Sequence, residues 1–183
     1  MRVVYIISKI ITLPGAYIKA FWEHLFCRVL GVPVESAELL RYDETLGHVE
    51  QEFAQTKLKS FLVCWLPGLA NKILGAIMFT GSALGLLYLG VGPKNAETGE
   101  ASYIFYVYVL LFYLGVSLLC NIFPLIENAL HMWEMLYSGE GVHIAWKIVL
   151  FIPAVIIVAG AYIERYALSL LFYIALIAVS LFV

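Results

Sequence analysis

Charged residues are scarce in this sequence. Only 13% of its 183 residues are Asp, Glu, Lys or Arg, whereas 63% are hydrophobic. Soluble domains have about 25% charged and roughly 45–50% apolar residues. The composition therefore excludes an ordinary soluble domain and indicates an integral membrane protein, with the lipid bilayer as its first partner.

Several other features are missing. No block of basic residues occurs and the net charge is -2, so we expect no nucleic-acid partner. The N-terminal apolar run has no small-residue cleavage site, so we expect no cleaved signal peptide. No repeat or soluble second domain is visible, which leaves a single membrane domain, 1–183. CxxC and Cys/His spacings are also absent, so we expect buried free thiols at Cys27, Cys64 and Cys120.

Long apolar runs dominate what is present. A membrane-spanning helix needs about 20 mostly apolar residues. Apolar runs cover residues 3–30, 60–91, 103 onward, 144–162 and 167–183, with a tight turn at "IERY" between the last two. We therefore predict an all-α membrane protein, a polytopic bundle of four to five spans. Helix breaks are expected close to Pro14, Pro67 and Pro124.

The polar insertion at 31–59 separates the first two apolar runs. "VPVESAELLRY" and "GHVEQEF" contain short apolar/polar alternations, which predict a strand pair or hairpin. An amphipathic interfacial helix is the alternative. Lys and Arg near span ends mark the cytoplasmic side. We place 31–59 there because the cations at or within this insertion are Arg28, Arg41, Lys57 and Lys59, whereas the turn after the second run has only Lys94.

Ionisable residues inside apolar runs indicate functional sites by default, because burying them in a bilayer is unfavourable. Lys19 and Glu23 are four residues apart, so they share a helix face and can pair. Each proline-containing run has polar residues close to its proline. The polar residues of these runs either converge on one intramembrane site or lie at separate positions at the membrane interface. The candidate polar network is Lys19, Glu23, Asn71, Lys72, Glu127 and Asn128, with His24, His48, Glu50 and His131 as secondary candidates.

Four motifs in series carry a family resemblance. "LPG" is followed by a helix and "LFCRVLGVPV", then by "GHVEQE", "LPGLAN" and "FPLIENA". This order and spacing resemble small bacterial membrane zincins related to site-2 proteases, up to about Trp133. The resemblance implies a bacterial cytoplasmic membrane. In the family, LPG is followed after three residues by H-E-x-x-H, which supplies two zinc ligands and a general base.

The family's catalytic residues are replaced here. In the aligned register, Lys19 stands at the first His, Ala20 at the Glu and Glu23 at the second His. Asn128 stands at a later Asp, a third-ligand position. A protonated lysine cannot bind a cation and alanine cannot act as a base. The resemblance therefore implies a degenerate site with no catalytic residue, metal or cofactor, in which Lys19 and Glu23 pair.

Three functions stay open. The leading expectation is a non-catalytic, site-2-protease-like pseudoenzyme that binds a transmembrane partner or a lipid in the groove that a protease would use for substrate. The second is a small channel or transporter with a midplane polar site between broken helices, although no inverted repeat is visible. The third is a membrane metalloprotease with a rearranged site built from His24, His48, Glu50 and His143.

Overall fold

The chain is mainly helical in the computed structural model, which describes residues 2–36, 48–54, 56–89, 91–94, 102–138 and 144–182. A π-helical turn, η1, directly continues the longest helix, α3. The predicted helical fold with a strand pair in the insertion is confirmed. The elements are α1 (Arg2–Ile11), α2 (Leu13–Leu30), β1 (Val34–Ser36), β2 (Glu50–Gln51), α3 (Lys57–Ala83), η1 (Leu84–Tyr88), α4 (Tyr103–Leu119), α5 (Ile126–Tyr137), α6 (Ile144–Val149), α7 (Phe151–Arg165) and α8 (Leu168–Phe182).

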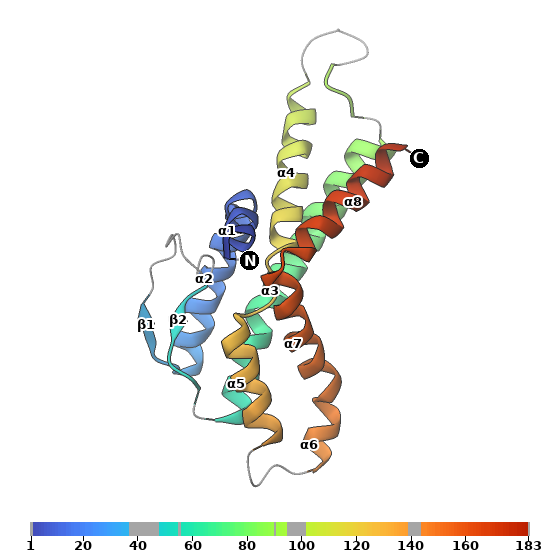
Figure 1. Ribbon diagram of the computed structural model, residues 1–183. Coiled ribbons are helices and arrows are strands. Elements are labelled where there is room, and N and C mark those ends of the chain that lie inside the picture. The colour runs from blue at the N-terminus through green and yellow to red at the C-terminus, as the bar shows by residue number, and fades with distance from the viewer. Residues whose placement is uncertain are drawn as a thin grey trace.

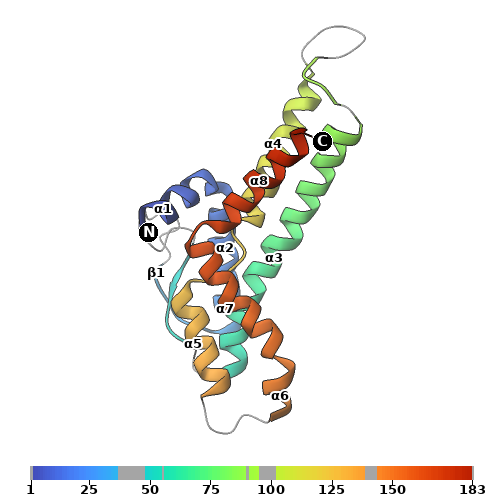
Figure 2. The same ribbon diagram turned by 45° about the vertical axis from the view of Figure 1, so that its right-hand side comes forward.

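The molecule is elongated, and α3 runs along most of its length (Figure 1). One half contains the end of α3 with α4 and α8. The other half contains the start of α3 with α2, α5 and α7, and the strand pair lies outside α2. The turned view shows the same division, with α1 near the level where the two halves meet (Figure 2). Three interrupted helical segments (α1–α2, α4–α5 and α6–α8) therefore lie around one continuous helix, α3.

The strand pair follows directly from the end of α2. Gly31 ends that helix in the left-handed conformation (φ 65°), and the N–H of Val32 donates to the carbonyl of Cys27 at 2.9 Å. The strands β1 and β2 are antiparallel, with Val34 opposite Gln51 and an irregularity before the next pair. The rest of the predicted insertion, 37–47, lies outside the described residues.

Two of the three predicted proline breaks are present. The chain bends by 94° between α1 and α2, next to Pro14. Between α4 and α5 it leaves the helical conformation from Asn121 to Leu125, which includes Pro124. The break predicted near Pro67 is wrong, because α3 continues through this proline without interruption. Proline removes one helical hydrogen bond but does not abolish a helix that its neighbours hold in place.

A further bend of 78° separates α7 from α8, at the position of the predicted turn. Ala167 adopts a positive φ of 55° there, which is uncommon for a residue with a side chain. The bend gives the third interrupted segment its change of direction, immediately after Glu164.

The polarity of the molecule is inverted relative to a soluble protein. Tyr88 is 84% exposed and Ile144 76% exposed, whereas Lys9 and Lys19 are each only 1% exposed. Extended apolar surface around buried charges is suited to lipid rather than water. By length and composition, the helix at 57–88 can cross a membrane, and the α1–α2 and α7–α8 pairs qualify if each bent pair counts as one span. The number of four to five spans stays a prediction.

Candidate functional site

The irregular segment at 121–125 (the α4–α5 break) lies at the centre of the candidate site. The two "LPG" motifs approach it through their glycines. A Cβ on Gly15 would overlap the carbonyl of Ser117, at the end of α4, and a Cβ on Gly68 would overlap the carbonyl of Ile122. Only glycine fits at either position, so the first motif brings the backbone of α2 against the end of α4 and the second brings the backbone of α3 against the broken segment.

Two buried amides join the three proline-containing segments. The Nδ2 of Asn71 donates to the carbonyl of Gly15 at 3.2 Å and to that of Asn121 at 2.7 Å. The Nδ2 of Asn121 is 2.9 Å from the hydroxyl of Thr12. Because these bonds link α2, α3 and the α4–α5 break, the segments converge on one site.

Glu164, at the end of α7, satisfies the backbone of the break. Its Oε2 accepts hydrogen bonds from the N–H groups of Ile122 at 3.2 Å and Phe123 at 2.7 Å. Its Oε1 accepts a hydrogen bond from Lys9 and is 3.6 Å from the ammonium of Lys19. One carboxylate therefore binds freed backbone donors and two cations in a buried position, where unpaired groups would be unfavourable.

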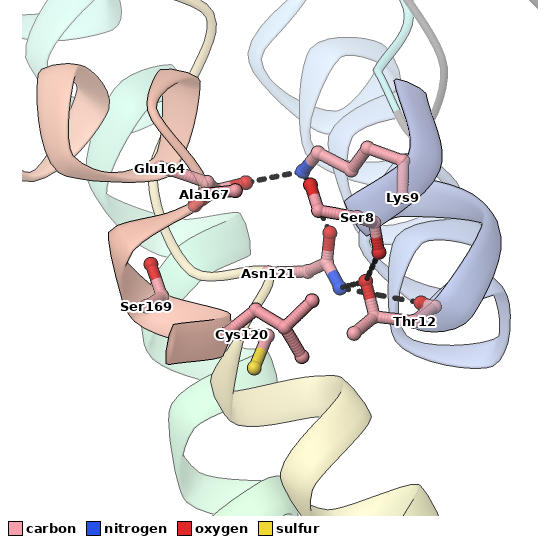
Figure 3. A pocket seen from close by; sticks show the side chains of 9 residues that line it. Ser8, Lys9, Thr12, Cys120, Asn121, Glu164, Ala167 and Ser169 are labelled. Atoms are coloured by element: carbon pink, nitrogen blue, oxygen red, sulfur yellow. Dashed lines mark hydrogen bonds and ion pairs between the residues drawn. The ribbon is translucent and has the colours of Figure 1, made fainter. Parts of the chain in front are cut away.

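The two buried lysines approach the break from different helices. Figure 3 shows Lys9 of α1 pointing toward Glu164, and its ammonium also donates to Oδ1 of Asn121 at 2.6 Å. Lys19 of α2 donates to the carbonyl of Phe123 and is 3.7 Å from Oε1 of Glu23. The lysines therefore neutralise the carboxylates and also bind acceptors of the broken segment.

Glu23 connects this network to the strand pair. Its Oε1 is 3.0 Å from Nδ1 of His48, and its Oε2 accepts the N–H of Val49 at 3.0 Å. Burial, followed by the nearby charge of Lys19, lowers the pKa of His48 from 6.5 to about 4. His48 is therefore neutral at pH 7, and its Nδ1–H donates to Glu23.

The structure brings together four of the sequence candidates and leaves the others apart. Glu127 is exposed, and the carbonyl of Asn128 instead accepts from Cys64 at 3.5 Å. His131 stacks on Phe53 with ring centroids 4.4 Å apart. The candidates that join the network are Lys19, Glu23, Asn71 and His48, and those outside it are Lys72, Glu127, Asn128, His24, Glu50 and His131.

Sequence reasoning missed five of the nine described network residues. Tyr5, Ser8, Lys9 and Thr12 recur with helical spacing on one face of α1, a signal that was available in the sequence. Glu164 is an isolated acid between two apolar runs, and such an acid also indicates a paired or functional charge. The network residues that were missed are Lys9, Thr12, Ser117, Asn121 and Glu164.

The charged side chains of the network form a cluster of ion pairs. Two ammonium groups, Lys9 and Lys19, face two carboxylates, Glu23 and Glu164, so the charges balance with His48 neutral. Within the described ranges, no three His, Cys, Asp or Glu side chains are grouped as metal ligands. His143, a candidate for a rearranged metal site, lies outside those ranges.

A separate cavity opens between α3, the α4–α5 break and α7. Its volume is about 120 Å³, and its lining is apolar except for Lys72. Lys72 is the one sequence candidate that reaches this cavity. The ionic centre itself lines only a small pocket of about 10 Å³, formed in part by Lys9, Asn121 and Glu164, so the apolar cavity beside it is the larger of the two.

Comparison of the chain with family models, with curated proteins and with solved structures found no match. The resemblance to membrane zincins therefore remains a prediction from the motifs.

Proposed function

We propose that this chain is a non-catalytic, site-2-protease-like membrane protein that binds a transmembrane helix or a lipid in the cavity beside α3. The observation that carries the proposal is the environment of Lys19. Its ammonium contacts Glu23, Glu164 and the carbonyl of Phe123. A fixed cation at the position of the family's first ligand supports a structural ionic centre in place of zinc.

The proposed membrane arrangement is polytopic. Four segments enter or cross the bilayer: α1–α2, α3 with η1, α4–α5 and α6–α8. Exposed apolar side chains around buried ion pairs support this arrangement, because lipid cannot satisfy charges. Arg28, Lys57 and Lys59 lie at the strand-pair end of the molecule, which supports a cytoplasmic location of 31–59. A bacterial cytoplasmic membrane follows from the resemblance.

Helix binding without cleavage can be tested with the purified protein in phosphatidylcholine nanodiscs. The probe is a fluorescent single-span peptide of leucine and alanine. We expect saturable binding and an intact peptide mass after incubation with zinc. Leu69→Trp, at the cavity, should weaken binding, whereas Ile77→Trp, exposed on the same helix away from the cavity, should not.

Two results would contradict the proposal. The first is zinc-dependent cleavage of the peptide that Glu23→Gln abolishes, which would favour a rearranged metalloprotease. The second is a lack of saturable binding for the peptide and for lipids alike.

A transporter is the second candidate, and one observation favours it. Lys9, Glu164, Lys19, Glu23 and His48 form a continuous chain in which each neighbouring pair lies within 3.7 Å. Chains of ionisable groups between broken helices carry protons or ions in transporters. Proton flux into vesicles that contain the protein, abolished by Glu164→Gln, would support this alternative.

A further inference from the structure

The cavity between α3 and α7 has a composition that restricts its occupant. Its walls include Trp65 and Leu69 of α3, Phe123 of the break, and Ile156 and Ile157 of α7. The volume of about 120 Å³ compares with the ~150 Å³ of an apolar cavity that holds benzene. One large apolar side chain or a short length of alkyl chain therefore fits.

Among the described residues, Lys72 is the one charged group in the cavity wall, and its pairing differs from that of the buried lysines. Lys9 and Lys19 are buried and paired with carboxylates. Lys72 is exposed and makes no hydrogen bond or ion pair in the part of the chain that the structure describes. It is therefore a cation that has no partner among the described residues and lies beside an apolar cavity.

The position of Lys72 along its helix sets the depth of this cation. It has 15 residues before it and 16 after it in the 32-residue span at 57–88. At about 1.5 Å per residue, either end of the span is more than 20 Å away. Lysines near helix ends extend to the interface, but this route is closed to a lysine at mid-span.

We propose that Lys72 and the cavity beside it bind a transmembrane helix of another protein that has an Asp or Glu at mid-depth. The carboxylate pairs with Lys72, and an apolar side chain of the same helix enters the cavity. A phospholipid offers only acyl chains at this depth, because its phosphate stays at the interface. The inference rests on the proposed function, since it names the partner of the same site.

Binding to two matched probes tests the inference. The peptides have a leucine and alanine host sequence with Glu or Gln at the central position, and the protein is in phosphatidylcholine nanodiscs at pH 8. The Glu peptide should bind wild type about tenfold more tightly, the size of one interhelical polar contact. This preference should vanish in Lys72→Met and persist in Lys59→Met, a change near the end of the same helix. Lys72→Glu should instead prefer a peptide with a central Lys.

The outcomes separate this inference from the proposed function. Equal binding of the two peptides to wild type would overturn the inference but leave the proposed function standing, provided that Leu69→Trp still weakens both. Displacement of the Glu peptide by anionic phospholipid, seen in wild type and absent in Lys72→Met, would also overturn it and would assign Lys72 to a headgroup. Failure of all peptides and lipids to bind would contradict the proposed function itself. Lys72→Met should keep the wild-type unfolding temperature, because the side chain is exposed.

Discussion

Glu164 accepts the N–H of Phe123 at 2.7 Å, although 41 residues separate them. This bond links the end of α7 to the break between α4 and α5. The same carboxylate binds Lys9 and faces Lys19, so one side chain satisfies both the irregular backbone and the buried cations. The broken helix and the ionic network therefore stabilise each other.

Replacing Glu164 should be strongly destabilising. In Glu164→Ala, Lys9 loses its carboxylate and Lys19 loses one of two, while two backbone N–H groups lose their acceptor. Leaving buried charge unpaired costs about 3–5 kcal/mol. Equilibrium unfolding in detergent micelles measures the loss. Glu127→Ala is the control, since Glu127 is exposed and its removal should change stability by less than about 0.5 kcal/mol. Equal effects of the two changes would contradict the assigned role of Glu164.

Glycine substitutions test the close contacts at the break. Gly68→Ala would push a Cβ into the carbonyl of Ile122, so it should destabilise the protein by about 1–3 kcal/mol. Gly81→Ala in the same helix has open space around its Cβ and should be neutral or stabilising by up to about 1 kcal/mol. Thermal unfolding of the two variants measures the difference. If Gly68→Ala were as stable as Gly81→Ala, the backbone contact would not exist.

The local patterns of the sequence predicted part of this architecture. The long apolar runs indicated helices, and the apolar/polar alternation indicated the strand pair. Lys19 and Glu23 were predictable as a pair because helical spacing alone places them on one face. Pro124 marked a break that the structure contains. These features all depend on residues close together in sequence.

Long-range features were beyond such patterns. Lys9 and Glu164 pair across 155 residues, and no local rule connects them. Pro67 was expected to break α3, but the local preference of proline yields to the contacts of the surrounding helices. The sequence left open whether the three proline segments converge, and the amide of Asn71 settles this by bonding to both other segments.

His48 predicts a pH dependence of stability. In the folded protein, burial and the charge of Lys19 lower the pKa of His48 to about 4; Glu23 and Lys9 also face the imidazole. In the unfolded chain the pKa is 6.5. The unfolded chain therefore binds more protons between these values, so stability falls as the pH falls from 6.5 to 4. The full difference is about 3 kcal/mol. Urea unfolding between pH 4 and 8 measures it, and His48→Gln should flatten the profile in this window. An unchanged profile in His48→Gln would exclude His48 as the source.

The central claim is that Lys19 and Glu23 form a buried, energetically coupled ion pair at the centre of the network. A double-mutant cycle of Lys19→Met, Glu23→Gln and the double variant, unfolded in detergent micelles, tests it most directly. Lys19→Met should cost about 3–5 kcal/mol, since Glu23 would lose its cation. The double variant should be more stable than the sum of the two single losses predicts, with a coupling energy of about 1–3 kcal/mol. Near-neutral single changes with zero coupling would contradict the claim and place both side chains on a solvated face.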